Sequence, residues 1–226
     1  MAASAVVLVG VLLGTTPLEQ IAAHEAAGDD GGALAWAEWW AQSEPRSPYG
    51  HLEAARLGLK LGKSLETVDW HLRWAYALAP DNPRAVHLWG VLEEERGDIA
   101  GAREAQRRAI ALRSDYVDAH RRLAALAQRA GDWAEAEKEL RYLISGGDGD
   151  TGLKLQLASV QEKSGQAAQA ERTLTALHQA QPKNAVVTRA LADFYGRAGK
   201  SKQASALLRS LEPQKKAMRS LNASRR

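Results

Sequence analysis

The sequence predicts an all-α fold built from repeated two-helix units, on three observations. Glycines recur every 34 residues between segments whose apolar residues follow a helical period. An alanine stands five residues after each of these glycines, where a second helix needs a small side chain to approach the first. No run alternates Val, Ile and Thr residues as a strand would. The four clearest glycines are Gly97, Gly131, Gly165 and Gly199, and the alanines are Ala102, Ala136, Ala170 and Ala204.

The stretch RAGDWAEAEKEL, residues 129–140, indicates how two helices are joined. Gly131 suits the end of a helix, where the left-handed conformation is least costly for glycine. Asp132 suits the N-cap of the next helix, because its carboxylate can accept a hydrogen bond from a free backbone N–H. The stretch therefore predicts a tight helix-turn-helix.

Small and apolar residues also recur before the turn glycines. Eight residues before them stand Trp89, Leu123, Leu157 and Leu191, and seven residues before them stand Gly90, Ala124, Ala158 and Ala192. A two-helix unit of 34 residues with this pattern resembles the tetratricopeptide repeat family. The resemblance implies a right-handed α-solenoid of about six tetratricopeptide helix-turn-helix repeats, each packed on its neighbours.

We divide the chain into an apolar N-terminal segment, residues 1–13, a solenoid, residues 14–213, and a basic tail, residues 214–226. The expected repeats are 14–47, 48–82, 83–116, 117–150, 151–184 and 185–213. In the first, Gly28 precedes Ala33 by five residues and Pro45 closes the unit. In the second, Gly62 lies 35 residues before Gly97, so this unit is one residue out of register.

Residues 1–18 carry no charged side chain and reach the lower length limit of a membrane span, about 18 residues. No basic residue precedes the segment and no clear cleavage site follows it. Two interpretations stay open: a membrane contact, as an anchor or uncleaved signal, or a capping helix of the solenoid. The first predicts a membrane-associated or periplasmic protein, and the second a cytoplasmic one.

The C-terminal residues 209–226 hold six cations against one anion, a net charge of +5, whereas the whole chain carries +3. Such a tail can bind phosphates or an anionic surface, which gives an alternative function in nucleic-acid or anionic-surface binding. The other interpretation is a solvated, frayed end. We favour the solvated end and do not expect nucleic acid as the main partner.

The sequence offers no pattern for catalysis, a cofactor or a metal. It has no cysteine, and its six histidines include no pair four residues apart, so we expect ordinary surface or half-buried histidines. The glycine-rich stretch at residues 145–154 lacks the order of a phosphate-binding loop and fits a turn between repeats. We therefore expect no enzyme, no cofactor and no metal.

The family resemblance implies a concave groove, lined by the first helix of each repeat, that holds a peptide segment of a partner protein. The implied groove residues are Arg84, His87, Glu94, Arg121, Gln128, Arg129, Lys163, Arg189, Asp193 and Arg197. Cations outnumber anions over the last three repeats, and the planar fork of arginine suits carboxylates, so an acidic peptide segment is the expected ligand. The alternative is an ordinary solvated face.

Six of the seven tryptophans lie in the first 90 residues. Trp70 and Trp74 are off the apolar face of their predicted helix, and together with Trp39 they form a candidate exposed aromatic patch. The patch fits a partner or membrane contact, or packing against the N-terminal segment. The resemblance as a whole implies a scaffold or adaptor that binds a partner protein in the assembly of a larger complex, which is membrane-associated if residues 1–18 contact a membrane.

Overall fold

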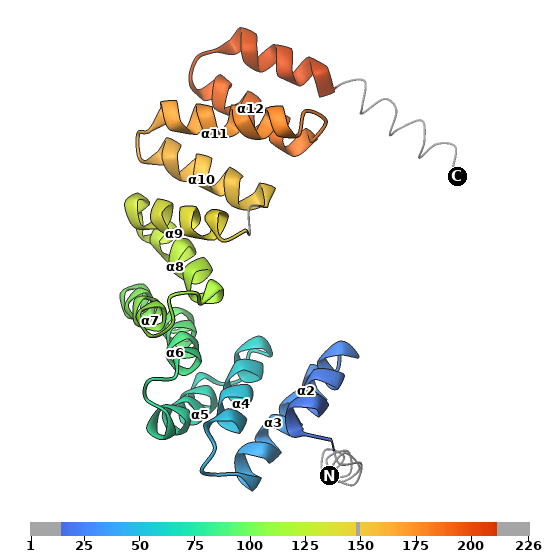
Figure 1. The fold of residues 1–226 in the computed structure, drawn as a ribbon, viewed down its shortest axis with the longest axis vertical. Helices are drawn as coiled ribbons and strands as arrows, with labels where there is room; N and C mark the ends of the chain where they lie inside the picture. Colours follow the sequence, from blue (N-terminus) through green and yellow to red (C-terminus); the bar gives the residue numbers. More distant parts are fainter. Residues whose placement is uncertain (1–14, 148–149, 212–226) are drawn as a thin grey trace, which may run out of the picture. The chain divides into compact units, whose positions relative to one another are not determined.

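The computed structural model describes residues 15–147 and 150–211, and these residues form helices and the turns between them (Figure 1). The helices are α2 (Pro17–Ala26), α3 (Asp30–Ser43), α4 (Pro48–Lys60), α5 (Leu65–Leu78), α6 (Pro83–Glu95), α7 (Ile99–Leu112), α8 (Val117–Ala130), α9 (Trp133–Ser145), α10 (Thr151–Lys163), α11 (Ala167–Ala180) and α12 (Ala185–Arg197). Residues 201–211 are also helical. The described part of the chain contains no strand, which confirms the predicted all-α repeat fold.

The turns within the helix pairs have the predicted glycine conformation. The turn glycines have positive φ angles, for example 74° at Gly131 and 85° at Gly97, a region that glycine occupies without steric cost. After Gly131, a carboxylate oxygen of Asp132 accepts a hydrogen bond from the backbone N–H of Glu135 at 3.1 Å. The helix-turn-helix prediction for this stretch is therefore confirmed.

The alanines that follow the turn glycines are buried where the second helix of a pair packs on the first. Ala33, Ala102, Ala136 and Ala170 have no exposed surface, and Ala204 is 8% exposed. In the pair α4 and α5 the turn has one extra residue, because the N-cap is Ser64, two residues after Gly62. Val68 therefore takes the buried position, and the 35-residue spacing is explained.

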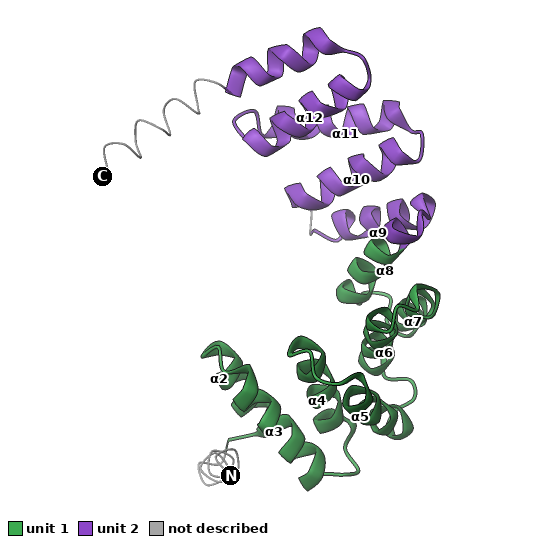
Figure 2. Cartoon of the chain, turned by 180° about the vertical axis from the view of Figure 1, so that it is seen from behind, with its two compact units in different colours: residues 1–126 green, residues 127–226 purple. Residues whose placement is uncertain are grey.

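The chain divides into two compact units, residues 1–126 and residues 127–226, which are coloured separately in Figure 2. In the first unit, α3 and α4 enclose a core that includes Trp36 and Leu57, and α4, α5 and α6 enclose a second core around Leu72 and Leu92. In the second unit, α10, α11 and α12 pack around Leu174 and Phe194. The 34-residue period does not reveal this division.

The described helices begin within the uncharged N-terminal stretch. Thr16 is the N-cap of α2 and forms a capping box with Glu19, and Pro17 opens the helix. Residues 1–14 of the candidate membrane segment and residues 214–226 of the basic tail lie outside the described residues. Among the helices that are described, none is both long and apolar enough to cross a membrane.

Candidate functional site

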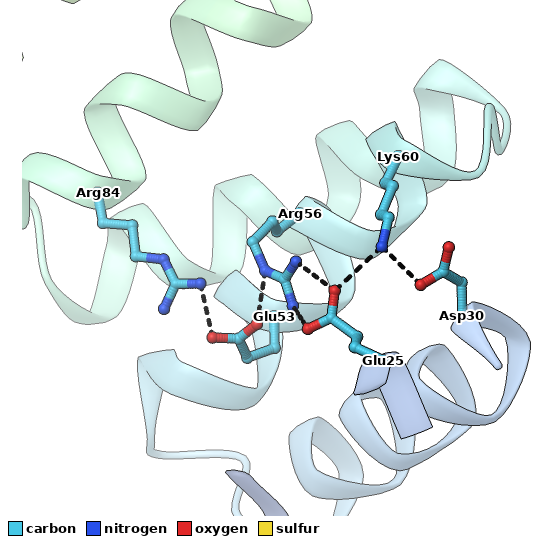
Figure 3. Close-up of polar contacts among 6 residues, drawn as sticks. All are labelled: Glu25, Asp30, Glu53, Arg56, Lys60 and Arg84. Atoms are coloured by element: carbon cyan, nitrogen blue, oxygen red, sulfur yellow. Dashed lines mark hydrogen bonds and ion pairs between the residues drawn. The ribbon is translucent and has the colours of Figure 1, made fainter. Parts of the chain in front are cut away.

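Arginine–glutamate pairs join the first helices of successive helix pairs in the unit of residues 1–126. Arg56 of α4 donates to both carboxylate oxygens of Glu25 in α2, at 3.0 and 2.7 Å. Glu53, also in α4, lies 2.6 Å from the guanidinium of Arg84 in α6. Figure 3 shows these side chains in one continuous chain of contacts. Helices α2, α4 and α6 therefore present charged side chains to a common face.

Lys60 extends this network of ion pairs to α3. The amine of Lys60 contacts Glu25 at 3.3 Å and Asp30 at 2.6 Å (Figure 3). Hydrogen bonds from Arg56 lower the pKa of the Glu25 carboxyl, and the hydrogen bond to Asp30 raises the pKa of the Lys60 amine. The network is therefore charged at neutral pH, and its cations are the more exposed members, with side-chain exposures of 29% for Arg56 and 46% for Lys60.

Glu53 is the buried member of the network, with 4% of its side chain exposed. Arg56 Nε donates to one of its oxygens at 2.8 Å, and Arg84 contacts the other. A buried carboxylate needs such partners, because leaving it uncompensated costs several kcal/mol. The predicted groove residue Arg84 is thus engaged in holding Glu53.

Two more predicted groove residues of this unit are engaged within the fold. The ring Nδ1 of His87 lies 2.7 Å from Oε1 of Gln106, and its ring lies 5.1 Å from that of Tyr116. Burial lowers the pKa of His87. Glu94 is 14% exposed and contacts Arg122 of α8 at 3.4 Å. Arg121 is exposed on α8.

The unit of residues 127–226 repeats the arginine–glutamate arrangement. Arg197 of α12 donates to both oxygens of Glu162 in α10, at 2.7 and 2.8 Å, and this pairing lowers the pKa of the glutamate. The amine of Lys163 lies 5.1 Å from the ring centre of Trp133. Arg189 and Asp193 are exposed on α12, and among the described residues Arg189 has no ion pair.

Gln128 and Arg129 complete the predicted set. Gln128 is half-buried and Arg129 is exposed near the end of α8. The described part of the chain contains no group of three His, Asp or Glu side chains arranged to hold a metal ion.

Arg56 and Lys60, which lie on the face shared by α2, α4 and α6, are not among the residues predicted from the sequence. A signal for Lys60 was present: it stands two residues before its turn glycine, as do Arg129, Lys163 and Arg197 in later repeats. The extra residue after Gly62 does not affect this spacing, because it follows the glycine. Counting backwards from the glycine would have identified the position.

The aromatic residues of the candidate patch separate in the structure. Trp70 and Trp74 lie together on α5, with ring centres 6.2 Å apart, and both contact the ring of His51. Trp39 is half-buried, meets Trp36 edge to face at 5.4 Å and packs against the core between α3 and α4. Trp70 and Trp74 are 52% and 46% exposed, so they remain the open part of the patch.

Three histidines are more buried than expected from the sequence. His51, His71 and His120 are 3%, 7% and 4% exposed, so the expectation of surface or half-buried histidines is wrong for them. The Nδ1 atoms of His51 and His71 lie 3.1 Å apart, and Nε2 of His120 lies 2.9 Å from the carbonyl oxygen of Ser114. These hydrogen bonds compensate the burial of the rings.

Comparisons with known proteins agree with this architecture. A family model described as tetratricopeptide repeat matches residues 161–221. A tetratricopeptide repeat protein from Parabacteroides merdae is similar in structure, with a TM-score of 0.65 and 17% identity over 86% of this chain and 77% of that one. YrrB, described as a tetratricopeptide repeat protein with an unusual peptide-binding site, has a TM-score of 0.66 and 15% identity, covering 84% and 98%.

PilF of Pseudomonas aeruginosa also shares the fold, with a TM-score of 0.66 and 15% identity over 94% of this chain and 91% of that one. No curated protein sequence matches the chain. At these identities the structural likeness establishes the fold, and the family model adds sequence support in the C-terminal part. The described chain thus has the fold of tetratricopeptide repeat proteins, and residues 161–221 also match the sequence model of that repeat.

Proposed function

We propose that the chain is a non-enzymatic scaffold that binds an acidic peptide segment of a partner protein on the face that the first helices form within a unit, in the assembly of a larger complex. The tetratricopeptide repeat fold supports a role in protein–protein interaction. The observation that carries the proposal is that arginine–glutamate pairs join first helices in both units, from α4 to α2 and from α12 to α10.

These pairs present guanidinium groups that can exchange one carboxylate for another. In the second unit, 60% of the Arg197 side chain is exposed, as is 27% of its partner Glu162. An exposed ion pair contributes only about 0–1 kcal/mol. A peptide carboxylate can therefore replace Glu162 with little loss of stability, and the planar fork keeps a bidentate geometry.

Arg189 supplies a second cation on the same helix. It precedes Arg197 by eight residues in α12, which places the two about 12 Å apart along the helix axis at ~1.5 Å per residue. An extended peptide rises about 3.3 Å per residue, so carboxylates about four residues apart match this spacing. We propose such a pair of acidic residues as the recognised feature of the partner.

A photo-crosslinking amino acid tests which helices meet the partner. Ser159, exposed on the first helix α10, and Ala176, exposed on the second helix α11, form a matched pair of positions. We expect p-benzoylphenylalanine at residue 159, in the full chain incubated with source lysate, to capture a discrete protein and the same label at residue 176 to capture none. Equal capture at both positions would contradict the proposal.

Charge reversal separates acidic-peptide recognition from general attraction. Arg189→Glu should abolish capture of the partner protein by the label at residue 159, because the new carboxylate would repel a carboxylate of the peptide. The control Arg172→Glu makes the same change in charge at an exposed position of α11 and should leave capture intact. Capture that survives Arg189→Glu would rule out recognition of an acidic segment at α12.

Membrane contact through residues 1–18 and binding of anionic partners by the tail, residues 214–226, stay predictions from the sequence. A comparison of the full chain with residues 15–226 in vesicle co-sedimentation tests the first. Removal of residues 214–226 tests the second, since it should reduce the salt dependence of any nucleic-acid binding.

A further inference from the structure

A hollow of about 430 Å³ lies beside the two exposed tryptophans of the first unit. Helix α5 lines it with Trp70, His71 and Trp74, α4 with His51, and α3 with Glu38. The remaining lining residues are Ala41, Gln42, Pro45 and Thr67. The volume falls in the range of ligand-binding pockets, about 300–1,000 Å³. Apart from His51, the helical lining residues belong to the second helices α3 and α5, so the lining differs from the charged face of α2, α4 and α6.

The repeat geometry produces such a hollow, but it does not require tryptophan. A second hollow, of about 570 Å³, lies one repeat later, lined by α5, α6 and α7. The α7 residues that correspond to Trp70 and Trp74, counted from the helix N-cap, are Glu104 and Arg108. Charged side chains thus occupy the positions that Trp70 and Trp74 have in the preceding repeat. Two indoles that are about half exposed there are better explained by binding than by packing.

The charges around the hollow are unbalanced. Among the described residues, Glu38 has no ion pair or hydrogen bond, and no Lys or Arg lines the hollow. The two histidines add no positive charge at neutral pH. Their Nδ1 atoms lie 3.1 Å apart, so one ring must accept the hydrogen bond with an unprotonated nitrogen. Burial lowers the pKa of both rings, that of His71 to about 4.

An aromatic wall beside an uncompensated carboxylate favours a cationic occupant. The faces of tryptophan rings attract ammonium and guanidinium groups, and tryptophan is the strongest of the aromatic side chains in this respect. An apolar occupant such as a leucine side chain would bury the Glu38 carboxylate without a partner, which is costly. A guanidinium would stack on an indole and pair with the carboxylate at the same time.

We propose that the hollow formed by Glu38, His51, Trp70 and Trp74 binds an arginine or lysine side chain of a partner protein. Except for His51 of α4, the residues of this site lie on the second helices α3 and α5, apart from the charged face of the first helices, and the site binds the opposite charge. One chain can then hold two segments of opposite charge, as a scaffold that brings two partners together would do.

Fluorine NMR of the full chain labelled with 5-fluorotryptophan tests the proposal. The resonances of Trp70 and Trp74 are assigned with Trp70→Phe and Trp74→Phe variants. The probes are a capped Gly-Arg-Gly peptide, its norleucine analogue and tetramethylammonium chloride. We expect the arginine peptide to shift both resonances in a saturable manner, while the resonance of Trp133, in the other unit, stays in place.

Substitutions test whether Glu38 recognises the positive charge of the peptide. Glu38→Gln should raise the dissociation constant of the arginine peptide by at least about tenfold, as expected for loss of a hydrogen bond to a charged group. Glu95→Gln removes the same charge from an exposed position of α6 and should have no effect. If Glu38→Gln lowers the melting temperature, Trp70→Leu provides a second variant, because Trp70 is half exposed and its loss should spare the fold.

Each other outcome would overturn the proposal. Equal shifts with the norleucine peptide would show an apolar anchor site. A response to tetramethylammonium but not to the arginine peptide would show a site for small ammonium compounds. No shift with any probe would show that the tryptophans are surface residues without this role. Arg189→Glu should leave the shifts unchanged, so failure here and failure of the acidic-peptide proposal are distinguishable.

Discussion

Replacing Gly90 with alanine tests the close packing of α6 on α7. A Cβ atom at this position would lie 2.3 Å from Nε2 of Gln106, 3.0 Å from Cβ of Ala105 and 3.1 Å from the carbonyl oxygen of Ala102. Gln106 is fully buried, and its amide makes two hydrogen bonds to His87, at 2.7 and 3.1 Å. The added methyl group therefore fits only if Gln106 moves and its hydrogen bonds are disturbed.

The net effect follows from opposing contributions. Alanine is favoured over glycine inside a helix by about 0.5–1 kcal/mol. Overpacking a filled interior costs about 1–3 kcal/mol, and each lost hydrogen bond of Gln106 costs about 0.5–1.5 kcal/mol. We expect Gly90→Ala to lower the free energy of unfolding by about 1–3 kcal/mol, since the steric and hydrogen-bond costs exceed the gain in helix propensity.

Urea denaturation followed by circular dichroism measures this change. The control is Gly196→Ala in α12, where an added Cβ meets no atom within 4 Å. There the helix propensity acts alone and should raise the free energy of unfolding by up to about 1 kcal/mol. If the Gly90→Ala variant is as stable as the unchanged protein, or more stable, the result would contradict the close packing of α6 on α7 at this position.

Three further predictions concern the turn, the packing and the buried histidines. Asp132→Ala removes the N-cap of α9 and should cost about 0.5–2 kcal/mol in urea denaturation; an unchanged midpoint would show that the cap is dispensable. Ala136→Leu, at a fully buried position of the same helix, should cost about 1–3 kcal/mol, and an unchanged melting temperature would contradict the repeat register. Because burial lowers the pKa of His71 to about 4, the unfolded chain binds more protons than the folded one between that value and about 6.5. The free energy of unfolding should therefore decrease as the pH is lowered from about 6.5 to about 4, by about 3 kcal/mol in total from this residue. A His71→Gln variant with the same pH dependence of unfolding would refute the last prediction.

Local constraints explain why the turns and the small residues could be predicted. A helix that must reverse direction in two or three residues needs a residue with positive φ, and Gly28, Gly62, Gly97, Gly131, Gly165 and Gly199 have it. Buried Ala102 and Ala136 lie at a fixed distance after those turns, because the packing distance between paired helices recurs in each repeat. These features depend on sequence neighbours, so one sequence is sufficient to predict them.

The candidate sites depend on contacts between distant residues, and these were predicted poorly. Arg56 and Glu25 are 31 residues apart, and their pairing depends on how α4 packs on α2. His51 and His71 appear as scattered histidines in the sequence, but α4 and α5 bring their rings together. Helix propensity carries no information about which side chains meet across two helices. Trp39 was grouped with Trp70 for the same reason, although it packs on Trp36.

Hydrogen–deuterium exchange of the full chain, with and without its captured protein partner, tests the central claim most directly. Binding on the face that the first helices form within a unit should slow exchange in α4 and α6, or in α10 and α12, and leave the second helices α7 and α11 unchanged. Slower exchange confined to the second helices, with none in the first helices, would contradict the proposed peptide-binding face.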